Sequence, residues 1–176
     1  ALLRLGRRVL EKSSLTVDYF DALNLKSTLL KGLLIIWQDK LHGREMPCRK
    51  DFDPLELPAS MWPHIILIDV LHGDPERFRY RLIGTHVVDA LSRDVTGQII
   101  DEIQSRADYD VFVEGFRWVV ENHRPMQSNG SANFVNKKWM TFESLILPLS
   151  EDGSTVNMLM VPTVFTLDQT HNEPLF

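Results

Sequence analysis

Apolar and polar side chains alternate with a period of two from Phe78 to Ile83, and the run ends at Gly84-Thr85. This alternation predicts a half-buried β-strand, and the Gly-Thr step after it is typical of a helix start. An apolar run over residues 64–71 precedes the strand across the turn signal Gly73-Asp74-Pro75. The two runs therefore predict an antiparallel β-hairpin.

Matching the apolar faces of this hairpin predicts its register. The faces consist of Ile66, Ile68 and Val70 on the first strand and of Phe78, Tyr80 and Leu82 on the second. Bringing these faces together pairs Val70 with Tyr80, which places Asp69 opposite Arg81 on the other side. We therefore expect Asp69 and Arg81 to form a polar pair that faces outward or into a polar seam.

An amphipathic helix is predicted ahead of the hairpin. It starts at Ser27, which can act as N-cap, and runs to about His42, where Gly43 ends it. Its apolar stripe consists of Leu30, Leu34, Trp37 and Leu41, widened by Leu29, Leu33 and Ile36. A face of this breadth must be covered by another part of the protein.

Three further helices are predicted. Residues 53–56 form a short one, with Asp53 as N-cap, Pro54 as the first helical residue and Glu56 as the capping-box partner. A second short helix follows Thr85 and runs to about Leu91. The longest covers residues 107–123, since its apolar residues recur every three or four positions and Pro125 stops it.

The last part of the chain predicts three strands of an antiparallel meander, over residues 125–135, 138–149 and 155–165. Turn signals at Asn136-Lys137 and at residues 150–153 separate them. Both faces of the last two strands are apolar, with Leu145, Leu147, Leu149, Met158, Met160 and Val164 on one and Phe142, Ile146, Leu159, Val161 and Phe165 on the other.

A sheet with one face in water has apolar residues on its other face only. Because both faces of this sheet are apolar, both must be covered by other parts of the protein. The long helix and the short helices can cover one face, and the helix over residues 27–42 can cover the other. The pattern fits a covering helix of the same subunit and one of a neighbour. Homodimerisation through Leu30, Leu34, Trp37 and Leu41 is therefore a hypothesis.

Composition narrows the class of protein. A chain of 176 residues with 44% hydrophobic residues fits one domain with an extension. The net charge of -5 argues against nucleic acid as a partner. A single cysteine, Cys48, excludes an internal disulfide framework and suits a reducing cytoplasm, which is the predicted location. No apolar run approaches the roughly 20 residues of a membrane-spanning helix.

Motifs for catalysis or metal binding are missing. The carboxylates of Asp51, Asp53 and Glu56 lack the glycine turn and the regular ligand spacing of a calcium loop, and the helix cap explains two of them better. There is no His-Glu-x-x-His zinc pair, no phosphate-binding glycine loop and no Gly-x-Ser-x-Gly turn. We therefore predict no catalytic residue, no metal site and no enzyme activity.

Several short motifs occur in an order that resembles the PAS family of sensor domains, with the closest resemblance to free-standing bacterial PAS-like proteins. The resemblance covers roughly residues 37–165. Besides the order of elements, it rests on Trp37, on Arg44, Pro47, Arg49, Phe52 and Pro54, on the run from Phe78 to Thr85, on Thr96-Gly97, on Arg124-Pro125, on Leu147-Pro148-Leu149-Ser150 and on Asp152-Gly153.

The resemblance implies an α+β PAS fold, in which a five-stranded antiparallel sheet carries helices on one face that enclose a small cavity. Here the N-terminal amphipathic helix would cover the other face. It also implies a non-catalytic sensory or regulatory role in signal transduction. We expect an N-terminal extension over residues 1–43, a PAS-like sensor domain over 44–166 and a loose tail over 167–176.

The cofactor-binding branches of the family can be compared residue by residue. Flavin photosensors carry a reactive cysteine in an Asn-Cys-Arg motif between the second and third strands, whereas Cys48 precedes the first strand. Haem-binding members use a histidine on the long helix; His123 lies at the end of that helix, where a cap is the simpler interpretation. His86 is interpreted as a first-turn or surface histidine. The cofactor is therefore unknown.

A ligand pocket, if present, would be lined by Ile66, Ile68, Tyr80, Leu82, Phe112, Phe116, Ser144, Ile146 and Met160. The hydroxyl of Ser144 or Tyr80 would orient a polar group of a small-molecule ligand. The alternative is that these residues fill a solid core.

Three functions remain open. A ligand-responsive module that acts on a signalling partner is the first. A ligand-free adaptor would need a large exposed apolar surface. An enzyme with a cone-shaped α+β fold would need a buried Asp–His or Asp–Arg pair beside a water-filled pocket, and such folds open with several long helices rather than with a hairpin.

Overall fold

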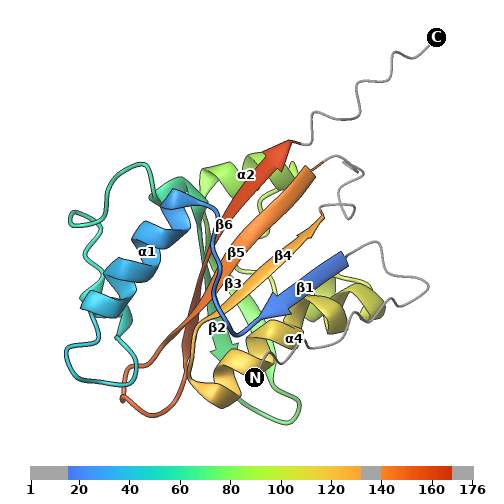
Figure 1. Ribbon diagram of the computed structural model, residues 1–176. Helices are drawn as coiled ribbons and strands as arrows, with labels where there is room; N and C mark the ends of the chain where they lie inside the picture. The colour runs from blue at the N-terminus through green and yellow to red at the C-terminus, as the bar shows by residue number, and fades with distance from the viewer. Residues whose placement is uncertain (1–15, 132–139, 168–176) are drawn as a thin grey trace.

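The computed structural model describes residues 16–131 and 140–167 (Figure 1). Within these ranges, six strands form one antiparallel sheet in the order β1-β4-β5-β6-β2-β3. The strands are β1 Thr16–Phe20, β2 Ile65–Leu71, β3 Arg77–Ile83, β4 Met126–Ser131, β5 Met140–Leu149 and β6 Met158–Leu167. The helices are α1 Thr28–Asp39, α2 Thr85–Leu91, α3 Ile100–Ile103 and α4 Arg106–Asn122, with short 3-10 turns at η1 Arg49–Asp51 and η2 Trp62–His64.

The predicted α+β architecture is confirmed, with one strand more than expected. Strand β1 comes from the segment that was interpreted as an extension, and it pairs with β4 at the edge of the sheet. Its alternation places Tyr19 inward, where the side chain is buried. The turn predicted at Asn136-Lys137 and the tail beyond residue 167 lie outside the described residues.

Both faces of the sheet are covered, as the alternation in the last two strands predicts. Figure 1 shows α1 on one side of the sheet and α4 on the other. Leu145, Leu147 and Leu149 pack in one apolar layer with α1, whereas Ile146 lies in the other layer with α4. Helix α1 covers the sheet of its own chain.

Helix α1 forms where its capping signal predicts. The Ser27 hydroxyl accepts a hydrogen bond from the Leu30 amide at 3.3 Å, which satisfies one of the free N–H groups at the helix start. The helix ends at Asp39, about one turn before the predicted end. Leu30, Leu33 and Trp37 are buried, while Leu34 and Leu41 are half-buried at the margin of the same layer.

The predicted register of the hairpin is wrong by two residues. Asp69 lies opposite Arg79, and Val70 lies opposite Phe78. Farther from the turn a one-residue bulge changes the offset again, because Ile68 pairs with Tyr80 while the preceding Leu67 pairs with Leu82, so Arg81 is the extra residue. Pattern matching within each strand does not detect such an insertion.

Asp69 and Arg81 nevertheless lie on the same side of the sheet. An oxygen of Asp69 is 2.7 Å from Nη2 of Arg79, and the other is 3.4 Å from Nη1 of Arg81. The carboxylate is buried, whereas both guanidinium groups reach solvent. This polar seam belongs to the α1 side of the sheet, since Asp69 also pairs with Met158 of the layer that packs on α1.

The short helix predicted at residues 53–56 is a turn. The Asp53 carboxylate accepts a hydrogen bond from the Leu55 amide at 2.8 Å, and Glu56 forms an ion pair with Lys40 of the α1 C-terminus. Leu55 is 93% exposed, and Pro58 prevents a helix that starts at Asp53 from continuing. By contrast, α2 and α4 lie close to their predicted bounds, and Ser105 caps α4.

Candidate functional site

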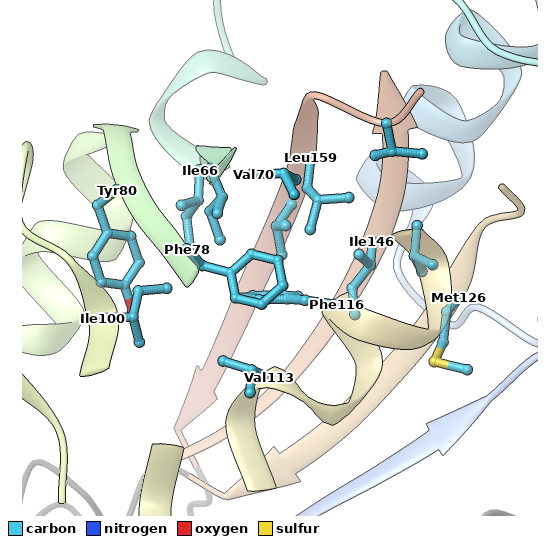
Figure 2. Packing of buried hydrophobic residues seen from close by; sticks show 14 of the residues in the cluster. Ile66, Val70, Phe78, Tyr80, Ile100, Val113, Phe116, Met126, Ile146 and Leu159 are labelled. Carbon is cyan, nitrogen blue, oxygen red and sulfur yellow. The ribbon is translucent and has the colours of Figure 1, made fainter. Parts of the chain in front are cut away.

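A cavity of about 70 Å³ lies between the sheet and the helices α2 and α4. This volume is well above the roughly 10–15 Å³ that one water molecule needs. All six strands contribute to its lining, which is mostly apolar. Figure 2 shows the neighbouring core, where the rings of Phe78 and Phe116 meet edge to face with centroids 5.4 Å apart.

Seven of the nine predicted pocket residues line this cavity: Ile66, Ile68, Tyr80, Phe112, Phe116, Ser144 and Ile146. The other two lie elsewhere. Leu82 is 38% exposed, because the bulge at Arg81 turns it to the opposite side of the strand. Met160 pairs with Leu67 and packs in the layer under α1.

The prediction missed lining residues from one strand that it did not place and from two strands that it did. Val17 and Tyr19 come from β1, and Ser128 and Thr163 come from β4 and β6. The alternation of Val17 and Tyr19 is a weak strand signal that could have found the first pair. The other two become recognisable only when the strand register is known.

Three hydroxyl side chains cross the cavity floor in a row. Ser128 lies opposite Ser144, and Ser144 lies opposite Thr163, on three neighbouring strands. The Ser144 and Thr163 oxygens are 2.8 Å apart and share a hydrogen bond. All three residues are buried, and all three line the cavity. We call Ser128, Ser144 and Thr163 the hydroxyl row.

Two tyrosines, Tyr19 and Tyr80, line the cavity. The Tyr19 hydroxyl donates toward the backbone carbonyls of Val111 and Phe112, each at 2.9 Å, which ties β1 to α4. Burial raises the pKa of both Tyr19 and Tyr80, and the charge of Arg93 opposes this rise at Tyr80. Both phenols are therefore neutral, and they are donors rather than anions at physiological pH.

A pair of histidines lies beside the cavity, at the start of α2. The ring centroids of His64 and His86 are 4.0 Å apart. His86 Nε2 accepts a hydrogen bond from the Phe165 amide at 3.3 Å, and His64 Nδ1 donates to the Thr163 carbonyl at 3.2 Å. His86 lies in the first turn of its helix, as predicted, and it depends on staying neutral to accept its bond.

We expect this arrangement to make the protein less stable in mild acid. Burial, and secondarily His64, lower the pKa of His86 below its ordinary value of 6.5, against the effect of Asp89. The unfolded chain therefore binds the proton more readily, so stability is lost as the pH falls below about 6.5 toward the lowered pKa. The melting temperature should fall between pH 7.5 and pH 5.5.

The control is His86→Gln, which keeps an acceptor near the Nε2 position but does not titrate. The fall in its melting temperature over the same range should be smaller. The lowered pKa values of Asp51, Asp94 and Asp152 act only at more acidic pH and do not interfere. Identical pH profiles for the two proteins would show that His86 is not the titrating group.

The residues weighed as cofactor ligands lie away from the cavity lining. His123 is the C-cap of α4, with a left-handed backbone, and its Nδ1 is 3.4 Å from a carboxylate oxygen of Glu45. Cys48 precedes η1, where its amide donates to Asp51. Within residues 16–131 and 140–167, no group of three or more His, Cys, Asp or Glu side chains could hold a metal ion.

Comparison with protein families decides what kind of domain carries this cavity. The family model described as PAS domain matches residues 25–161, which is most of the chain. The chain belongs to the PAS domain family. This PAS domain is thus a sensory or regulatory module in general character, and the family is typically non-catalytic. Searches of curated proteins and of solved structures returned no match.

The matched segment includes α1 and the sheet from β2 to β5, together with part of β6, but it begins after β1. The PAS match therefore spans both apolar layers. Among the described helices, none is long and apolar enough to cross a membrane.

Proposed function

We propose that this PAS domain is a ligand-responsive regulatory module, in which a small molecule binds in the cavity and changes how α1 packs on the far side of the sheet. The supporting observation is the cavity itself. It has an apolar lining with a few hydroxyl groups, which is the usual composition of a small-molecule site. A solid core would not leave this space.

Strand β5 connects the cavity to α1. Ser144 and Ile146 line the cavity, whereas the residues between and after them, Leu145 and Leu147, lie in the layer under α1. Alternate side chains of a strand point to opposite faces, so a ligand that shifts β5 changes the surface on which α1 rests. The shift is limited by how much better the ligand binds one arrangement than the other.

The output of this module would pass through a signalling partner or a second copy of the chain. Helix α1 is the element that such a partner would contact, and Ile35 on its outer side is 57% exposed. A ligand-free adaptor is less well supported. Among the described residues, the exposed large apolar side chains are Ile35 on α1, Leu55 in a turn and Leu82 on β3, so they come from three separate segments.

An enzyme with an acid–base pair at the cavity is also less well supported. The Asp69 carboxylate and its arginine partners, Arg79 and Arg81, are absent from the cavity lining and belong to the α1 side of the sheet. Asp108 and Arg93 do line the cavity, but Arg93 is exposed to solvent, so these two residues are not a buried Asp–Arg pair.

A thermal-shift screen tests the proposal. Toluene and small alcohols are suitable probes for a cavity of this size, and a ligand at about 100 times its Kd stabilises a protein by about 2.7 kcal/mol. We expect at least one probe to raise the melting temperature. Val161→Phe, which adds a ring on the cavity side of β6, should reduce the affinity for that probe at least about tenfold.

The matched control is Leu82→Phe, the same kind of enlargement at a half-exposed position away from the cavity. This variant should keep the response of the unmodified protein. If no probe stabilises the protein, or if the response survives in Val161→Phe, the cavity is not a ligand site.

A further inference from the structure

The hydroxyl row identifies the chemistry of the ligand. Resting on the proposed function, we propose that the cavity takes an uncharged molecule with an apolar body and one oxygen-bearing head group, an alcohol or a ketone, and that Ser128, Ser144 and Thr163 hold this head. The first argument is the position of the row. These three residues lie side by side across an otherwise apolar sheet face, and each is only 3–5% exposed.

The second argument is unused hydrogen-bonding capacity. A hydroxyl has one donor and two acceptor positions. Ser144 and Thr163 share one bond, and Thr163 Oγ1 is also 3.4 Å from the Val161 carbonyl. Among the described residues, Ser128 Oγ has no side-chain hydrogen bond, and no fully enclosed polar atom is left without a partner. The Ser128 hydroxyl therefore faces the open space of the cavity.

The row thus offers a donor and several acceptors to whatever occupies the cavity. Burying such groups without a partner is costly, so they select a ligand that can bond to them. An alcohol can both donate and accept here, and a ketone can accept from Ser128.

The third argument concerns charge. The charged residues in the lining are Arg93 and Asp108, and Asp108 is already bonded to the Ser105 hydroxyl at the helix N-cap. Neither belongs to the strands that carry the row. The side chains next to the row on the same strands are Phe142, Ile146, Val161 and Phe165. A carboxylate or an ammonium group placed among them would lose its water without gaining a counter-charge, so a neutral head is favoured.

The apolar body has a place beside the row. Phe142 lies opposite Phe165, and their ring centroids are 6.1 Å apart. Ile66 and Phe116 close the cavity from β2 and α4. A short aliphatic or cyclic group attached to the head would lie against these side chains.

The test compares hexan-1-ol, hexanoate and toluene, with affinities measured by NMR titration of the full chain at pH 7.5. We expect hexan-1-ol to bind at least about tenfold more tightly than hexanoate. One neutral hydrogen bond is worth a factor of about 2–12 in affinity. Ser144→Ala and Thr163→Val should each weaken hexan-1-ol binding by about 3–10-fold and change toluene binding less than about twofold.

The matched control is Thr141→Val, the same change on β5 at an exposed position outside the cavity lining. It should leave all three affinities unchanged. The comparison of probes on the unmodified protein needs no variant, so it stands even where a substitution impairs folding.

The outcomes separate this inference from the function on which it rests. If toluene binds but hexan-1-ol gains nothing from the row, the assignment of the head group is overturned and the ligand-binding cavity stands. Tighter binding of hexanoate would also overturn it, in favour of an anion held near Arg93. If none of the three probes perturbs the resonances of the cavity residues, both the inference and the proposed function fail.

Discussion

Replacing Trp37 with alanine should lower the free energy of unfolding by about 3–5 kcal/mol, the range for removing a buried large aromatic side chain. Trp37 is only 4% exposed and packs between α1 and the sheet. Its indole Nε1 also donates to the carbonyl of Pro148 at 3.0 Å, so the variant leaves a buried acceptor without its partner. Urea denaturation followed by circular dichroism measures the loss.

Two further variants separate the contributions of Trp37. Trp37→Phe keeps an aromatic ring but removes the donor, and we expect it to cost about 1–3 kcal/mol. Trp62→Ala is the control, because Trp62 is only half-buried and its indole donates to Pro54 at a solvent-exposed site. If Trp37→Ala costs no more than Trp62→Ala, α1 is not held on the sheet as described.

Replacing Gly84 with alanine should lower the free energy of unfolding by about 2–3 kcal/mol, through overpacking. A Cβ at this position would lie 2.3 Å from the carbonyl oxygen of Pro63 and 2.5 Å from its carbonyl carbon. These are backbone atoms, which cannot rotate away as a side chain could. The φ angle of Gly84 is -66°, so close approach rather than backbone freedom explains the glycine.

Gly73→Ala is the control for Gly84→Ala. The nearest atom to its added Cβ is the Pro75 carbonyl oxygen at an ordinary 3.6 Å. This variant should be neutral or more stable by about 0.4–1 kcal/mol, because alanine restricts the unfolded chain. Equal losses in the two variants, measured by thermal unfolding at fixed pH, would contradict the steric explanation.

The sequence predicts the elements whose signals are local. Ser27 and the apolar stripe after it are enough to place α1, and the apolar residues on both sides of β5 and β6 are enough to predict cover on both faces. The segment at residues 53–56 shows the limit of capping signals. Asp53, Pro54 and Glu56 are suited to a helix start, but Pro58 follows so closely that a helix cannot continue, and the segment forms a turn.

Register and cavity geometry depend on partners that are distant in the sequence. The bulge at Arg81 is fixed by how β3 fits β2, and it reverses the side on which Leu82 lies. Seven predicted residues line the cavity because they lie on the inward faces of predicted elements. Ser128 and Thr163 were not predicted as cavity residues, because the sequence does not show which residues lie beside a single hydroxyl side chain on the neighbouring strands.

Strand β1 sets a practical boundary for engineering this protein. The ring of Tyr19 occupies the space above Gly115, where even one added carbon would be 2.2 Å away, and its hydroxyl joins the strand to two carbonyls of α4. A version shortened to the matched residues 25–161 would lack the Tyr19 ring and leave a cavity next to Gly115. It would also expose the edge of β4, which could then pair with other chains. Minimal versions of the sensor should therefore begin no later than Thr16.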